Sequence, residues 1–195
     1  MTYDPLGLLR VLNDHRVSYV VIGGFAAVAY GSPLPTQDVD ITPSRTLTNL
    51  GRLSGALTDL EARVRVDGTP GGLAFRHSAR TLRDVMVLNL TTRLGDLDLV
   101  VAPTGGASYE ELAERGRTLD LGDVLVPLAS LDDVIASKEA AGRPKDRAAL
   151  PLLRSCGTGG ASPVNGLADQ DAAQLALLGA ARLPQLQAGR DVLQG

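Results

Sequence analysis

Short strand-like segments alternate with helix-like segments along most of the chain, and no other feature of the sequence restricts the fold as much. A β-branched apolar run ends at Gly23-Gly24, a helix-like stretch follows at 25–30, and residues 38–41 then alternate polar and apolar side chains. Further strands are expected at 62–66, 85–90 and 96–101, the last two at hairpin spacing. Strands interleaved with helices predict a mixed sheet with helices packed on it, in an α/β or α+β fold.

Apolar residues at three- and four-residue spacing predict the helices. Leu8, Leu9 and Leu12 give this spacing near the N-terminus, and Ser130 opens a later helix with a capping pattern. The other expected helices are 48–60, 78–84, 109–115, 130–141 and 144–153, and DGTPGG at 67–72 is expected to be a turn.

The 195 residues are too few for two independent cores. We expect a sheet-containing core over 1–125 and a helical C-terminal part over 126–195. A Gly/Ser/Pro-rich linker is expected near 155–166, with one further helix at 171–183.

The composition excludes several classes of protein. Hydrophobic residues make up 44% and charged residues 21%, which excludes disorder as the dominant state. Two Phe, four Tyr and no Trp leave too few aromatic side chains for platforms that stack single-stranded bases. The net charge of −3 does not attract a polyanion, so any nucleic-acid partner depends on local basic patches.

With one cysteine and two histidines, the chain has few sulfur or nitrogen ligands for a metal, so oxygen ligands are the candidates. Cys156 is the single cysteine, and His15 and His77 have no metal-ligand spacing, so both histidines are expected to be surface or core residues. The sequence shows no signal-peptide pattern and no apolar stretch of the roughly 18 residues that span a membrane. A cytoplasmic protein without a membrane partner is therefore expected.

The densest chemical signal is the pair Asp38 and Asp40. Two residues apart on a strand, both carboxylates project from one face and repel each other unless a cation lies between them. Mg²⁺ is commonly held by one or two carboxylates together with substrate phosphates. The Gly23-Gly24 turn would offer backbone N–H groups to those phosphates. The alternative is an exposed edge strand that happens to carry two acids.

Asp98 is a third candidate ligand. It lies within a predicted strand between Leu97 and Leu99, where an unpartnered carboxylate would be costly to bury. The alternative is a solvated acid near a strand end, as is expected for Asp96.

A basic segment follows at 136–154. It contains five basic and two acidic residues, whereas the whole chain is acidic. A lysine point charge and a planar arginine are suited to a transferring triphosphate or an RNA backbone, and Lys138 and Arg143 are the candidates. The alternative is a solvated helix face, above all for Lys145, Arg147 and Arg154.

These motifs resemble the DNA polymerase β-type nucleotidyltransferase superfamily. The resemblance rests on Gly23-Gly24, Gly31, Thr36-x-Asp38-x-Asp40 and a later Leu-Asp98-Leu strand, and it covers about 17–154. Within the superfamily the pattern is similar to the AbiEii/MenT nucleotidyltransferase toxins, whose Lys and Arg-Pro-Lys-Asp helical segment resembles Ser137-Lys138 and 143–146. Relatives commonly carry an Arg before the acidic strand, where this chain has 32–35 (SPLP).

The resemblance implies a nucleotidyltransferase core with a small mixed sheet flanked by helices. It implies metal ligation by Asp38, Asp40 and Asp98, with two Mg²⁺ ions during turnover, and catalytic roles for these residues, Lys138 and Asp146. Nucleotide binding is expected from Gly23, Gly24, Thr36, Lys138 and Arg143. Pairing with an Arg is the alternative role of Asp146.

The resemblance also implies a toxin of a toxin–antitoxin pair. It would transfer a nucleotide, with CTP the favoured donor, to the 3′ end of tRNA and so block translation. The Thr36 hydroxyl is expected to face the triphosphate, and its phosphorylation, by a kinase-like antitoxin or by misdirected self-reaction, would inactivate the enzyme. The open alternatives are transfer to a small molecule or a protein, and a catalytically dead binding module, against which the three carboxylates argue.

Overall fold

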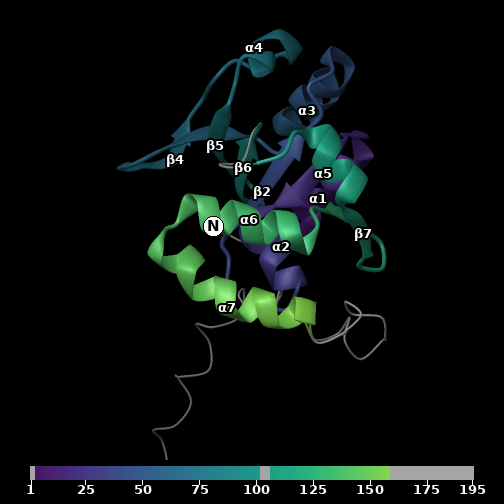
Figure 1. Ribbon diagram of the computed structural model, residues 1–195. Helices are drawn as coiled ribbons and strands as arrows, with labels where there is room; N and C mark the ends of the chain where they lie inside the picture. Colours follow the sequence, from purple (N-terminus) through teal and green to yellow (C-terminus); the bar gives the residue numbers. More distant parts are fainter. Residues whose placement is uncertain (1–2, 102–105, 159–195) are drawn as a thin grey trace, which may run out of the picture.

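The computed structural model describes residues 3–101 and 106–158 (Figure 1). In the described part of the chain an eight-stranded mixed sheet has the order β4-β3-β5-β6-β2-β1-β8-β7. The strands are β1 (Tyr19–Ile22), β2 (Asp38–Pro43), β3 (Arg63–Val66), β4 (Thr69–Leu73), β5 (Val87–Thr92), β6 (Gly95–Val100), β7 (Arg117–Asp120) and β8 (Leu125–Leu128). The mixed sheet confirms the predicted fold class.

The helices connect these strands and cover the sheet. They are α1 (Pro5–Asp14), α2 (Gly23–Ala29), α3 (Leu47–Asp59), α4 (Ala79–Arg83), α5 (Tyr109–Arg115), α6 (Leu131–Ala141) and α7 (Pro144–Thr158). Ser130 accepts a hydrogen bond from the Asp133 backbone N–H, which confirms the predicted cap of α6. The consecutive helices α6 and α7 pack side by side at one end of the molecule (Figure 1).

The centre of the sheet separates acids from the apolar core. Asp38 and Asp40 alternate along β2 with Val39 and Ile41, both fully buried. In the same way, Leu97 and Leu99 of β6 alternate with acids and are buried. These apolar side chains join one core cluster with leucines of α1 and α3. Burying one face of β2 and β6 therefore presents their carboxylates on the other.

Two elements extend beyond the ranges that the sequence predicted. DGTPGG is not only a turn, because Thr69–Leu73 forms the antiparallel strand β4 beside β3, with positive φ angles at Gly71 and Gly72. The last helix continues to Thr158, so the first residues of the expected linker near 155–166 are helical. The helix expected at 171–183 lies outside the described residues. Among the described residues, no helix combines the length and apolarity needed to cross a membrane.

Asn49 joins α3 to the ends of β1 and β2. Its side-chain amide donates to the carbonyl oxygens of Ser18 and Ser44, each at 2.9 Å, and its Oδ1 accepts from the Ser18 N–H at 2.6 Å. The residue is only 3% exposed.

Asn49→Ala should lower the free energy of unfolding by on the order of 2–4 kcal/mol, because it strands buried backbone groups without partners. Thr48→Ala, on the exposed face of the same helix, is the control and should change stability little. Urea denaturation measures both values, and equal small losses would show that Asn49 does not join these elements.

Candidate active site

The sheet brings together the three carboxylates that the sequence predicted as metal ligands. The parallel register of β2 and β6 places Asp40 beside Asp98 and Asp38 beside Asp96. One carboxylate oxygen from each of Asp38, Asp40 and Asp98 lies within 4.8 Å of the others. We call these three residues the acidic triad.

The electrostatics of the acidic triad are suited to binding a divalent cation. Burial, reinforced by the charges of Asp38 and Asp98, raises the pKa of Asp40 to about 6. Burial also raises the pKa of Asp98, although an ion pair with Arg65 opposes the shift. Carboxylate oxygens are the ligands that Mg²⁺ prefers, and a divalent cation would remove this repulsion, so the donor set fits Mg²⁺.

Gly23 and Gly24 begin α2, and Gly23 leaves room for the Asp40 carboxylate. Gly23 has φ +67°, and a Cβ atom on it would lie 2.0 Å from Asp40 Oδ2. The Gly24 N–H donates to the same Oδ2 at 3.4 Å. In this structure the Gly24 N–H therefore orients a triad carboxylate, whereas the sequence led us to expect it to face phosphate.

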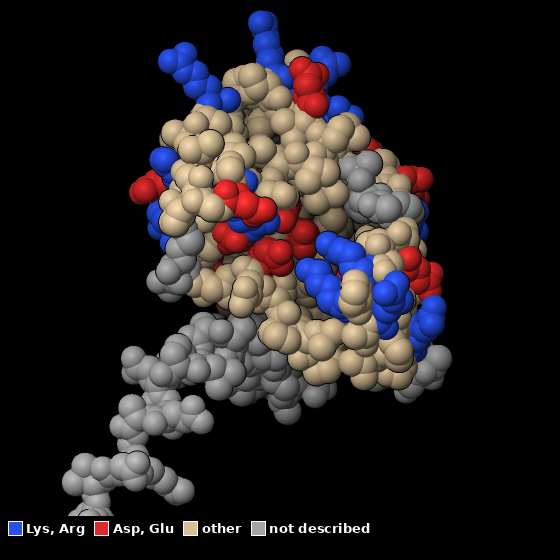
Figure 2. All heavy atoms as spheres, turned by 90° about the vertical axis from the view of Figure 1, so that its left-hand side faces the viewer, with Lys and Arg blue, Asp and Glu red and all other residues tan. Residues whose placement is uncertain are grey.

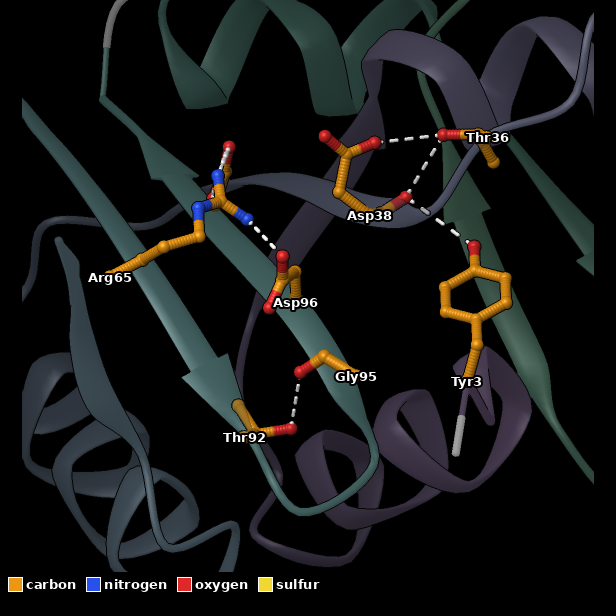
Figure 3. Close-up of polar contacts among 8 residues, drawn as sticks. Tyr3, Thr36, Asp38, Arg65, Thr92, Gly95 and Asp96 are labelled. Carbon is orange, nitrogen blue, oxygen red and sulfur yellow. Dashed lines mark hydrogen bonds and ion pairs between the residues drawn. The ribbon is translucent and has the colours of Figure 1, made fainter. Parts of the chain in front are cut away.

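Thr36 holds the other carboxylate of β2. Its hydroxyl lies 2.8 Å from Asp38 Oδ1 and 3.2 Å from the Asp38 carbonyl oxygen (Figure 3). In the structure this hydroxyl is directed at Asp38, and its contact with a triphosphate stays a prediction. The Tyr3 hydroxyl points at the same Asp38 carbonyl oxygen, 3.5 Å away (Figure 3).

The predicted basic residues line the same cleft as the acidic triad, Lys138 from α6 and Arg143 from the connection between α6 and α7. The Lys138 ammonium lies 3.4 Å from Asp146 Oδ1, and Arg143 Nε donates to Asp146 Oδ2 at 2.6 Å. Asp146 is 1% exposed. Burial opposes its ionisation, but the pairs with Arg143 and Lys138 outweigh that effect and lower its pKa. Asp146 thus positions Lys138 and Arg143, which agrees with the alternative role of pairing with an Arg. A catalytic role for Asp146 stays a prediction.

These groups line one cleft of about 880 Å³. Figure 2 shows acidic side chains inside a hollow and basic side chains gathered along one rim. Four carboxylates and four cations line it: Asp38, Asp40, Asp98, Asp146, Arg65, Lys138, Arg143 and Lys145. Gly23, Gly24 and Thr36 also line it, so the structure gathers every predicted site residue around a single cavity.

Sequence reasoning missed Arg65 and misplaced Asp96. Arg65 Nη1 lies 2.6 Å from Asp96 Oδ2, and its Nη2 lies 2.8 Å from both oxygens of Asp98. Asp96 is therefore paired, whereas we expected a solvated acid. The alternation RVRV at 63–66 signals a strand with two arginines on one face. It does not reveal the β3–β5–β6 order that directs Arg65 to the acids.

Several weaker candidates have structural partners. His15 pairs with Asp59 at 2.7 Å, and His77 lies 2.9 Å from the Ser54 hydroxyl, as expected of histidines without a catalytic role. Arg147 donates to the Gly142 carbonyl oxygen, and Arg154 pairs with Glu139 on the surface.

Comparison with solved structures places this geometry in a known fold. The lincosamide antibiotic adenylyltransferase LnuA, in its lincomycin-bound crystal structure, is 15% identical with a TM-score of 0.53, over 80% of this chain and 99% of that one. ANT(2″)-Ia in complex with adenylyl-2″-tobramycin is 15% identical with a TM-score of 0.47, over 89% of this chain and 94% of that one. No family model matches the sequence, and no curated protein matches it.

The chain has the nucleotidyltransferase fold. The similarity to LnuA carries this conclusion and confirms the fold implied by the motifs. At 15% identity it shows the fold and leaves donor and acceptor open.

Gly23→Ala should displace Asp40 and abolish divalent-cation binding. Gly71→Ala is a matched control, since Gly71 has φ +79° but open space around its Cβ position. Both changes introduce left-handed backbone strain of about 1–2 kcal/mol, and only the first adds the contact with Asp40. Mn²⁺ titration followed by electron paramagnetic resonance measures the difference. Equal cation affinity in the two variants would contradict the role given to Gly23.

The metal-free protein should lose stability as the pH rises. Folded Asp40, with a pKa of about 6, retains a proton that the unfolded chain releases near pH 4. The loss therefore begins near pH 4, is complete above pH 7, and amounts to on the order of 3 kcal/mol. Urea denaturation in chelator at several pH values should show this fall in wild type and much less of it in Asp40→Asn. Asp67→Asn, in an exposed turn, should behave as wild type, and an unchanged fall in Asp40→Asn would refute the assignment.

Proposed function

We propose that the protein is a Mg²⁺-dependent nucleotidyltransferase that joins a nucleotide to an acceptor hydroxyl and releases pyrophosphate. The observation that carries the proposal is the acidic triad of Asp38, Asp40 and Asp98, facing the cations Lys138 and Arg143 across one cleft. A triphosphate bound with Mg²⁺ fits a cleft with acids on one side and cations on the other. The carboxylates can bind the Mg²⁺, and the basic side chains can bind the phosphates.

The acidic triad would hold two Mg²⁺ ions, and these ions would supply charge neutralisation at the phosphates and acidify the attacking hydroxyl. The acceptor oxygen forms a bond to the α-phosphorus, and the bond from that phosphorus to the β-phosphate bridging oxygen breaks. Asp98 accepts a hydrogen bond from the attacking hydroxyl, whose proton passes to solvent. Lys138 and Arg143, held by Asp146, stabilise the charge that develops on the departing pyrophosphate.

For the acceptor we favour the 3′ end of tRNA, with CTP as donor and inhibition of translation as the result. Support comes from the motif resemblance to the AbiEii/MenT toxins and from the basic residues Arg143 and Lys145 at the cleft. These exposed cations offer contacts to an RNA backbone in a chain whose net charge is negative.

A hydroxylated small molecule is the second candidate acceptor. LnuA is a lincosamide antibiotic adenylyltransferase, and the match covers 99% of its chain. A cleft of about 880 Å³ has room for a nucleotide beside a compact acceptor.

We further propose that a cognate antitoxin, kinase-like in action, inactivates the enzyme at Thr36. A phosphate on this hydroxyl would remove the hydrogen bond to Asp38 and place about −1.5 to −2 charges beside the acidic triad. The added charge would repel the triphosphate of the substrate. Thr36→Val loses only the hydrogen bond and should keep measurable activity.

Asp38→Asn and Asp40→Asn should each abolish nucleotide transfer while leaving the fold intact, because each removes a metal ligand but little packing.

Lys138→Ala should lower kcat on the order of 100-fold, or ~3 kcal/mol, as expected when a preorganised charge-stabilising group is lost. Arg154→Ala is the basic control and should change kcat little, since Arg154 pairs with Glu139 away from the cleft. If Lys138→Ala and Arg154→Ala changed kcat equally, the basic segment would be only a solvated helix face without a role in transfer.

The acceptor is tested by incubating the protein and Mg²⁺ with each α-labelled nucleoside triphosphate. Reactions contain total tRNA, a panel of lincosamide and aminoglycoside antibiotics, or the proteins of a cell lysate. Label from CTP in tRNA is the expected result, and label in an antibiotic would replace the tRNA proposal with the small-molecule one. No label in any acceptor, including proteins of the lysate, would favour a catalytically dead binding module.

A further inference from the structure

Arg65 forms ion pairs with Asp96 and Asp98, the two acids of β6. The strand β5 lies between β3 and β6, and the Arg65 side chain extends across it to reach Asp98 and Asp96. Figure 3 shows the contact with Asp96. Its side chain is 32% exposed, whereas that of Asp98 is 13% exposed. The guanidinium therefore lies at the wall of the cleft and is not a distant surface charge.

The geometry of this contact restrains the Asp98 carboxylate. Nη2 lies 2.8 Å from both Asp98 oxygens, and Nη1 is held by Asp96 at 2.6 Å. Because a carboxylate oxygen has two acceptor positions, each Asp98 oxygen keeps one that points away from Arg65. A guanidinium anchored at two points sets the direction of these remaining positions better than a lysine could.

The charge of Arg65 has a second consequence. A divalent cation held by Asp98 would lie a few ångströms from a fixed positive charge, and that charge opposes its binding. A bound triphosphate would bring negative charge of its own and offset this repulsion. Arg65 thus orients the Asp98 carboxylate and also lowers the affinity of the acidic triad for a divalent cation without nucleotide.

We propose that Arg65 is a positioning residue that orients Asp98 for transfer and keeps the acidic triad from binding divalent cations tightly before nucleotide arrives. This inference rests on the proposed function. It assigns the cation to the site together with the triphosphate, and it gives Asp96, which is outside the acidic triad, the task of anchoring Arg65.

The test is Mn²⁺ binding to the full chain without nucleotide, followed by electron paramagnetic resonance. Arg65→Gln, whose amide can still donate to Asp98, should bind Mn²⁺ about tenfold more tightly than wild type while kcat falls at least about tenfold. A residue that merely supports the fold would lower both together. Arg65→Met, which also removes the charge, is the second variant should Arg65→Gln not fold.

Two further variants separate charge from geometry. Arg65→Lys keeps the charge but loses the two-point contact, so Mn²⁺ affinity should stay near wild type while kcat falls. Arg63→Gln is the matched control on the same strand and face, because Arg63 donates to the Gly72 carbonyl oxygen and should leave both values unchanged.

Two results would overturn the inference in different ways. Mn²⁺ affinity that is unchanged or weaker in both charge-removing variants, in a protein whose wild type is active, would refute the role of Arg65 alone. No Mn²⁺ binding by wild type or Arg65→Gln, with or without a nucleoside triphosphate, would overturn the metal-dependent function as well.

Discussion

Repulsion among carboxylates on one face of the sheet is the constraint on which the site depends. The parallel pairing of β2 with β6 is stabilised by burying apolar residues such as Ile41 and Leu97 on the opposite face. The same alternation forces Asp38, Asp40 and Asp98 together. The folding energy of the core therefore maintains an arrangement that the acids alone would oppose.

The surrounding residues make this arrangement specific. Gly23 leaves room for the Asp40 carboxylate. Thr36 donates a hydrogen bond to Asp38, and Arg65 forms an ion pair with Asp98. Across the cleft, buried Asp146 holds Lys138 and Arg143. One wall thus has unbalanced negative charge and the other presents cations, which is the polarity that a metal–triphosphate requires.

Local patterns in the sequence predicted the parts of this site that depend on short spacing. Asp38 and Asp40 share a face because they are two apart on a strand, and Asp98 stood out as an acid between two leucines. Arg65 could not be found this way, because its role depends on β5 lying between β3 and β6 in the sheet, and β3 and β5 are not consecutive along the chain. The strand within DGTPGG was missed for a similar reason, since glycine and proline predict turns while pairing with β3 forms a strand.

The most direct test of the central claim is a Mg²⁺ titration that follows the side-chain carboxyl carbons of the aspartates by ¹³C NMR in the presence of a non-hydrolysable nucleoside triphosphate. The account predicts that the carboxyl signals of Asp38, Asp40 and Asp98 shift together and saturably. Asp146, already paired with Lys138 and Arg143, should shift less. Signals of the acidic triad that do not respond to Mg²⁺ would contradict the account.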